Sequence, residues 1–422
     1  MTPSKATREQ LREHNRRLVL RMLYQGEVNT RAALATVTGL TKPTVSNLVG
    51  ELIDEGLVVE EGLGRASGSG GKRPTLLAFN PRARQVIGVA LGSERVSAAL
   101  ADLAGETSAV HVLEPAVAGP TPLRPGALGT TAPGPDTAGP DAAGMTKAGM
   151  TKAGTATTGT ATTGAAAVLR AVEDAVAALV PQLDAPLLAV GVAVPGRVRP
   201  GTGVVRRSAV LGIGDELPLG ELLTDRLGVP VHVGNFAELC ALGQFSYGLG
   251  ERTPTGTLVS MTLDDDLELG VVLHPSGAHF GSELAGPMIE ELHLGWSAFK
   301  ARAAELVRER PDALPWGERY LNVRRAAGDG DPGAAQLLSE LAAALARPLA
   351  WVVSVLQPAN VSLVGGVTDL GEAFLARLGA EATALLGGGA LDDVSLSMAY
   401  SNRLGAMGAV ALANRAELEL IA

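Results

Sequence analysis

Apolar positions near the start of the chain recur with the period of an α-helix. Their steps of three, four and seven residues predict a helix over about residues 7–25 with one buried face. The members of this face are Leu11, Leu18, Val19, Met22 and Leu23. A second helix is expected to begin near Thr30, whose hydroxyl can cap it, and to bury Leu34 and Val37.

A third predicted helix follows a tight turn. Gly39 lets the chain reverse, Thr41 can cap the helix, and Pro43 lies in the first turn, where a missing N–H is tolerated. An inward stripe is expected at Val45, Leu48, Val49 and Leu52. The residues left near the exposed N-terminal side are Lys42, Pro43, Thr44, Ser46 and Asn47. This pattern is typical of a helix-turn-helix, whose second helix contacts base edges in the major groove of DNA.

A β-hairpin is predicted after the third helix. Residues 57–59 form its first strand and Thr75–Phe79 the returning strand. The Gly-rich loop between them carries three cations, Arg65, Lys72 and Arg73, which suit contact with phosphates or the minor groove. Residues 1–82 are therefore expected to form a winged helix-turn-helix domain that binds a double-stranded DNA operator.

Charge is distributed unevenly along the chain. Residues 1–85 hold 13 Lys and Arg against 8 Asp and Glu, a net charge of +5. Since the whole chain carries −9, the remaining residues carry −14. A basic head on an acidic body is typical of nucleic-acid binding. A three-helix packing module that binds no DNA, with a solvated charged loop, remains the alternative.

Beyond residue 85 the pattern changes to strands alternating with helices, which indicates an α/β fold. Strands are predicted in residues 86–93, 95–106, 187–198, 229–235, 256–263, 269–277 and 361–366. Helices are predicted at 165–179, 217–227, 236–247, 283–310, 334–357, 370–386 and 406–418. Residues 83–422 form this body, and a low-complexity stretch at about 115–164 is expected to be a disordered insertion.

Composition adds two exclusions. The single cysteine, Cys240, excludes an intramolecular disulfide and a zinc site built from several cysteines. The N-terminal residues lack the apolar core of a signal peptide, and no run of about 18 apolar residues is present. A cytoplasmic protein with no membrane partner is expected.

Several stretches together resemble the ROK family, named after repressors, open reading frames and sugar kinases. They are TGLTKPTVSNLVGELIDEGLV, SGGKRP, VGVAVPGRV, LGVPVHVGNFAELCALGQFSYG, LAG at residues 284–286, VSLVGGV and GAMGAVALA. The resemblance covers nearly the whole chain outside the insertion. It implies an operator-binding head joined to a two-lobed, actin-like ATPase body. In sugar-responsive members this body binds a sugar, which changes the affinity of the oligomer for DNA.

At the positions that carry kinase chemistry in the family, this sequence has other residues. The family's Asp-x-Gly-Gly-Thr phosphate loop has Ala90 at the Asp and Glu94 at the Thr. A second Gly-rich phosphate turn is replaced by residues 264–270, whose four carboxylates would repel phosphate. We expect a solvated acidic turn there, with a divalent-cation site as the alternative. Phe236 stands at the catalytic Asp and cannot act as a base, so no catalytic residue and no enzymatic activity are expected.

The sugar and zinc positions of the family also differ. Pro287 and Glu290 stand where sugar-binding members have Glu and His, and the Cys-rich zinc loop is absent, so no metal or other cofactor is expected. His293, nearby, is interpreted as a surface or packing residue. Asn235, Glu238 and Glu290 remain as candidate ligand contacts, although Asn235 could equally cap the following helix. Ile213 and Phe236 would make such a site more apolar.

These patterns favour a transcriptional regulator, specifically a repressor, with a non-catalytic, pseudokinase-like body. The body would serve oligomerisation, as a homodimer or homotetramer on a palindromic, A·T-rich operator. It could also sense a small-molecule effector other than the usual sugar. An ATP-dependent sugar kinase and a sugar-responsive ROK repressor are the alternatives, together with regulation through a protein partner.

Overall fold

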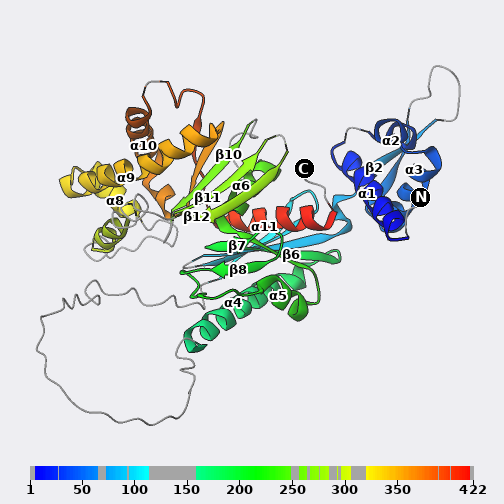
Figure 1. Cartoon of the computed structure of the whole chain (residues 1–422), viewed down its shortest axis with the longest axis horizontal. Coiled ribbons are helices and arrows are strands. Elements are labelled where there is room, and N and C mark those ends of the chain that lie inside the picture. Colours follow the sequence, from blue (N-terminus) through cyan, green and yellow to red (C-terminus); the bar gives the residue numbers. More distant parts are fainter. Residues whose placement is uncertain are drawn as a thin grey trace, which may run out of the picture.

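Figure 1 shows the chain in a computed structural model, with a small head at one end and a larger two-lobed body. The structure describes residues 5–26, 28–64, 73–92, 95–113, 158–248, 256–263, 267–274, 276–284, 292, 296–305, 320–387, 389–399 and 401–418. The described elements agree with the predicted α/β class, in which a helical head precedes two mixed sheets covered by helices.

The head consists of three helices and a two-stranded antiparallel hairpin. They are α1 (Lys5–Tyr24), α2 (Arg31–Thr38), α3 (Lys42–Asp54), β1 (Val58–Leu63) and β2 (Thr75–Phe79). The predicted caps are confirmed: the Thr30 hydroxyl accepts the Ala33 N–H, and the Thr41 hydroxyl accepts the Thr44 N–H. Gly39 ends α2 in the left-handed conformation, which permits the tight turn into α3.

Burial in the head confirms the α3 stripe and corrects two predictions. Every member of that stripe is buried, as is Leu34 of α2. Leu11 and Val37 were expected to be buried, but they are 52% and 56% exposed. Among the residues of α1 whose burial is described, those that are buried lie between Val19 and Leu23, so Leu11 extends beyond the core. In the two-turn helix α2, only the side that carries Leu34 faces its neighbours.

The first lobe is a five-stranded sheet with the strand order β5-β4-β3-β6-β9. Its strands are β3 (Gln85–Leu91), β4 (Val96–Asp102), β5 (Thr107–Leu113), β6 (Leu187–Val194) and β9 (Val231–Asn235). Strands β3, β6 and β9 are parallel, whereas β3, β4 and β5 form an antiparallel meander. Helices α4 (Thr158–Leu179) and α5 (Leu219–Leu227) pack against one face, and α11 (Ser401–Leu418) covers the other.

Helix α11 lies unusually close to this sheet because glycine faces it. A Cβ atom added at Gly88 of β3 would lie 1.9 Å from the Ala406 carbonyl oxygen, and one at Gly191 of β6 would lie 1.9 Å from that of Ala409. Neither position could carry a larger side chain without moving the helix. A short hairpin of β7 (Arg197–Arg199) and β8 (Val204–Arg207) follows β6.

The second lobe repeats this plan with the strand order β12-β11-β10-β13-β14. Its strands are β10 (Leu258–Leu263), β11 (Leu267–Leu273), β12 (Ala278–Glu283), β13 (Asn360–Val364) and β14 (Ser395–Ala399). Its helices are α6 (Phe236–Tyr247), which also packs on α11, α8 (Leu321–Gly328), α9 (Pro332–Leu356) and α10 (Gly371–Leu386), together with helical residues 296–305. Three 3₁₀ turns complete the described elements: Pro81–Ala83, Val180–Gln182 and Gly366–Leu370.

Element boundaries in the body differ from the predictions in several places, including the start of α11 at Ser401 rather than near residue 406. A helix was expected from residue 283, but Glu283 is the last residue of β12, where it pairs with Glu268 of β11. Strand pairing thus overrides the helical preference of this stretch. Helix α4 begins at Thr158, so the end of the expected insertion is helical, and residues 114–157 lie outside the described residues.

One of the described helices, α9, is long and apolar enough to cross a membrane, by length and composition only. Half of its apolar window is buried within the structure. Its buried residues, including Leu341, Leu345 and Leu349, pack in the core of the second lobe. The helix therefore has a sufficient explanation as a core element of this lobe.

Candidate functional site

The exposed end of α3 is the first candidate site. Lys42, Pro43, Ser46 and Asn47 are exposed, and Thr44 is half-buried with its hydroxyl 2.8 Å from that of Thr41. These side chains share the first turns of α3 because the buried stripe faces the opposite way. The helix dipole places partial positive charge at this end, to which Lys42 adds a full charge, while Ser46 and Asn47 supply polar side chains. This end of α3 can therefore offer both hydrogen bonds and positive charge to an anionic partner.

The hairpin of the head is the second candidate site, where cations were predicted in the loop. Arg73 is exposed just before β2, while Arg65 and Lys72 lie outside the described residues. The hairpin remains paired up to its loop, where the Gly64 N–H donates to the Pro74 carbonyl over 2.8 Å. The predicted wing contacts of the two outlying cations thus stay predictions, whereas Arg73 is available to solvent.

Apolar packing, more than ion pairing, positions α3. The side chains of Val45, Val49 and Leu52 are fully buried against the rest of the head. On the surface, Arg12 of α1 pairs with Glu51 of α3, and Arg16 pairs with Glu55, the residue that caps the C-terminus of α3. Exposed pairs of this kind contribute about 0–1 kcal/mol, whereas each fully buried aliphatic side chain contributes about 1.5–3 kcal/mol.

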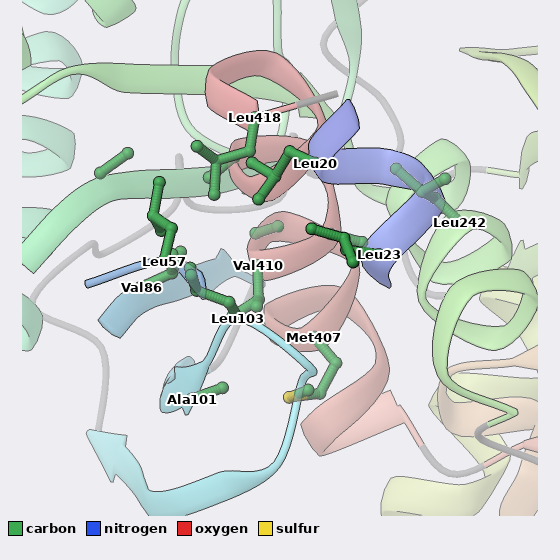
Figure 2. Close-up of a cluster of buried hydrophobic side chains, with 14 of the residues drawn as sticks. Leu20, Leu23, Leu57, Val86, Ala101, Leu103, Leu242, Met407, Val410 and Leu418 are labelled. Atoms are coloured by element: carbon green, nitrogen blue, oxygen red, sulfur yellow. The ribbon is translucent and has the colours of Figure 1, made fainter. Parts of the chain in front are cut away.

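The head is joined to the body through one continuous apolar cluster. Figure 2 shows Leu20 and Leu23 of α1 close to Val410 and Leu418 of α11, with Leu57 beside Val86. Polar contacts accompany this cluster. The Leu103 N–H donates to the Pro81 carbonyl over 3.0 Å, and the Asn414 amide donates to the Leu103 carbonyl over 3.3 Å. A shift of α11 against its sheet would therefore reach the head directly.

Ala90 and Phe236, two positions that the family resemblance identified as altered, lie near each other in the body. Phe236 begins α6, Ala90 lies near the end of β3, and Gly405 of α11 faces both. A Cβ atom at Gly405 would lie 2.7 Å from Phe236 Cε2 and 3.0 Å from Ala90 Cβ. These two positions therefore present apolar groups, which supply neither a metal ligand nor a proton acceptor. Within the described part of the chain, no group of three or more His, Cys, Asp or Glu residues could hold a metal ion.

Asn235 lies at the centre of the junction between the lobes and is fully buried. Its amide donates to the Gly196 carbonyl over 2.7 Å, and its Oδ1 accepts the Glu238 N–H over 3.0 Å. Glu238 returns the contact by accepting the Asn235 N–H, which completes a capping box at the start of α6. The capping role that the sequence left open for Asn235 is the one observed, and a ligand contact from it stays a prediction.

Glu238, on α6, also contacts β12 of the second lobe. Its Oε1 lies 2.6 Å from Nδ1 of His279 on β12, and both side chains are largely buried. His279 was not singled out from the sequence, which offered no signal beyond an isolated histidine in a strand. Glu290 and His293 lie outside the described residues, so their predicted roles stay predictions.

Glu268 was expected in a solvated acidic turn, and this prediction is wrong. Its side chain lies on β11, the residue is only 4% exposed, and its carboxylate accepts the Gly196 N–H from the other lobe. The β10–β11 ladder continues through Thr262 and Glu268 to the pair of Leu263 and Leu267, so only residues 264–266 separate the two strands. Those three residues lie outside the described part, and with them the alternative of a cation site.

Known proteins match both parts of the chain. Residues 143–278 and 301–416 match the family model described as ROK family, and residues 12–59 match that of the winged helix-turn-helix DNA-binding domain. A xylose repressor from Caldicellulosiruptor bescii is 24% identical over 266 residues, covering 62% of this chain and 54% of that protein. A xylose repressor from Bacillus spizizenii is 42% identical over 91 residues, which is 22% of this chain and 23% of that protein. The chain thus matches about half the length of the former relative and about a quarter of the latter.

Solved structures share the fold. A ROK family transcriptional regulator, described as a homologue of the E. coli MLC protein, has a TM-score of 0.67 at 17% identity and covers 97% of this chain and 98% of its own. A ROK family glucokinase from Streptomyces griseus, solved with glucose and AMPPNP, has a TM-score of 0.53 at 20% identity and covers 78% of this chain and 98% of its own. The family model matches more than half of the chain, so this protein, with its winged helix-turn-helix head and actin-like body, belongs to the ROK family.

Proposed function

We propose that the protein is a DNA-binding transcriptional regulator that represses its target genes. The observation that carries this proposal is the exposed polar end of α3 within a winged helix-turn-helix head. Relatives named xylose repressors support the sign of the regulation. The named repressor relatives are bacterial proteins. Bacterial chromosomal DNA lies in the cytoplasm, so we assign the protein to that compartment.

The proposed DNA contacts are polar and charged side chains of α3 and the wing. Lys42, Thr44, Ser46 and Asn47 read base edges in the major groove, and Pro43 packs beside them at the helix start. The wing cations are Arg65, Lys72 and Arg73, which hold the phosphate backbone or the minor groove. Two heads are needed to read a palindromic operator, so the working form is a homodimer or a homotetramer of this chain.

The body acts without phosphotransfer. Phe236 and Ala90 replace the carboxylates that the family's kinases would use, and they pack together at Gly405. We therefore assign the body to oligomerisation and to sensing an effector other than the family's usual sugar. Asn235, Glu238 and Glu290 remain the proposed ligand contacts. In a coupled assay with ATP, Mg²⁺ and a hexose, we expect no ADP release; steady release would favour the rival kinase function.

The decisive experiment begins with genome-wide occupancy mapping, which identifies an operator fragment. Binding of the full chain to that fragment is then followed by fluorescence anisotropy as the salt concentration rises. Log affinity should fall linearly with log salt, with a slope of about −0.9 for each phosphate neutralised. An affinity indifferent to salt would contradict the proposal.

Replacing a wing cation tests the assignment more finely. Arg65→Ala should weaken binding to all fragments alike and reduce the salt slope by about 1, because a phosphate contact carries no base preference. Arg170→Ala, an exposed arginine on α4 of the body, is the matched control and should leave the slope unchanged. Equal slopes for the two variants would remove Arg65 from the interface.

A further inference from the structure

The hairpin of β7 and β8 concentrates positive charge on an otherwise acidic body. Residues 86–422 carry a net charge of −14, yet this hairpin holds four exposed arginines. They are Arg197, Arg199, Arg206 and Arg207. In Figure 1 the hairpin lies beside β12 and β6, far from α3 in this view. A concentration of cations at this place is not explained by the DNA-binding surface of the head.

The strand register sets two of these arginines directly against each other. Arg197 is the cross-strand partner of Arg207, so their side chains leave the same face with Cβ atoms about 4.5–5.5 Å apart. The register then shifts, because Val198 pairs with Val205 and Arg206 is the extra residue of a β-bulge. Bulges redirect side chains and occur often beside functional sites. Like charges in directly opposite positions destabilise a hairpin, so this arrangement carries a cost.

A single carboxylate nearby contacts the other two arginines and offsets one of their two charges. Glu216 lies 2.7 Å from the Arg199 guanidinium and 3.3 Å from that of Arg206. Neither Arg197 nor Arg207 has an ion pair or a side-chain hydrogen bond with any described residue. Two adjacent guanidinium groups are thus left to solvent, with their fork-shaped sets of N–H donors unused.

The opposed pair adjoins the junction between the lobes. Gly196, the residue before Arg197, bonds to Asn235 through its carbonyl and to Glu268 through its N–H. Its φ of 106° and the absence of a side chain let it approach Arg207, whose carbonyl oxygen would lie 2.4 Å from an added Cβ. Strand β7 contacts β9 of the first lobe and β12 of the second. An occupant of the arginine pair would therefore bear on both lobes at once.

We propose that Arg197 and Arg207 form an oxyanion-binding subsite for a small molecule with a dianionic group, such as a phosphate monoester. Two guanidinium groups balance a charge of about −2, and planar forks match the oxygens of such a group. The repulsion that the hairpin carries when empty is relieved when the anion binds. This inference rests on the proposed regulatory function, for which it names the chemical class of the effector.

The test uses isothermal titration of inorganic phosphate into the full chain, with chloride replaced so that ionic strength stays constant. The natural chain should bind phosphate saturably at one site per chain. The variant Arg197→Gln/Arg207→Gln should bind at least about tenfold more weakly, because it loses the charge-assisted bonds of two arginines. Arg170→Gln/Arg325→Gln removes the same charge from exposed body positions without a described side-chain partner, and it should bind as the natural chain does.

A second measurement separates this proposal from the DNA-binding function. Without phosphate, both double variants should bind duplex DNA as the natural chain does, and their unfolding temperatures should match each other. If the natural chain binds no phosphate, or the Arg197/Arg207 variant binds it equally well, the subsite is refuted. If that variant loses DNA binding selectively, these arginines contact DNA and the proposal is wrong. If the natural chain binds phosphate but no DNA, the subsite stands and the proposed regulatory function fails.

Discussion

Two helix N-termini in this molecule share one local device and differ in their surroundings. Helix α3 is capped by the exposed Thr41, and helix α6 by the fully buried Asn235. Beyond the first cap, Lys42, Ser46 and Asn47 face solvent. Beyond the second, the largely buried Glu238 is bonded to His279 of β12. Capping chemistry alone therefore does not mark a binding surface, since the packing around the helix start decides what its polar groups can reach.

The same comparison explains where each region can tolerate change. An exposed cap contributes about 1 kcal/mol, and water replaces its bonds when it is removed. A buried network behaves differently, because each orphaned polar group retains its full desolvation penalty. The α3 surface can thus vary with the operator that it reads, whereas the α6 start is constrained by the fold.

The largest effect is expected from Asn235→Ala. This change leaves the Gly196 carbonyl and the Glu238 N–H buried without their partner. Each orphaned group costs about 1–3 kcal/mol, so the body should unfold at clearly lower urea concentration. Asn47→Ala, which removes an exposed asparagine, should change the stability by no more than about 0.5 kcal/mol. Equal stability of the two variants would break the comparison between the helix starts.

The second-largest effect is expected on DNA affinity, for which Asn47 matters more than Asn235. Asn47→Ala should weaken binding to the mapped operator by about 1–3 kcal/mol and relax the preference at one base pair. Binding to unrelated duplexes should hardly change, because those complexes depend on phosphate contacts. Asn322→Ala on α8 of the body serves as the control and should leave both affinities unaltered. Competition anisotropy against a panel of single-base operator variants provides the measurement.

The head could be predicted largely from its sequence because its determinants are local. Thr30, Thr41 and Pro43 act within one helical turn of their own positions, and the α3 stripe follows from helical spacing. Leu11 and Val37 fit the same spacing but are exposed, because periodicity does not reveal where a neighbouring element ends. Local rules thus give the elements of the head and miss the limits of its core.

The body was predictable as an alternation of elements but not as a site. Its buried strands and α6 appear in the residue pattern, whereas the register that buries Glu268 against Gly196 depends on two segments far apart in sequence. The bond between Glu238 and His279 is equally non-local. The family resemblance identified Ala90 and Phe236 as altered positions, and only the fold shows that both pack at Gly405.

Asp102 lies at the contact of head and body. It is half-buried, so its burial is intermediate between that of the exposed Thr41 and the fully buried Asn235. Its Oδ1 accepts the backbone N–H groups of Ala104 and Glu106, and burial is the main cause that raises the pKa of its carboxyl. The Glu106 carboxylate adds to this increase, while the two backbone bonds and Arg82 oppose it. A raised pKa in the folded state means that protonation favours folding. Its contribution is therefore complete below the unfolded pKa of about 3.9 and is lost as the pH rises through the folded value.

The smallest predicted effect follows from this sign. Asp102→Asn keeps an oxygen that can accept both N–H groups and carries no charge at any pH, so it escapes that loss. Relative to the natural chain, the variant should gain stability as the pH rises from about 3.5 to about 8, and most of the gain should fall just above the ordinary Asp pKa. Asp225→Asn, at an exposed position of α5, is the matched control and should show no such trend. Urea unfolding across this pH range measures the difference in stability between the variant and the natural chain. If the relative stability of the variant instead increased as the pH fell, the surroundings of Asp102 would favour its charged form.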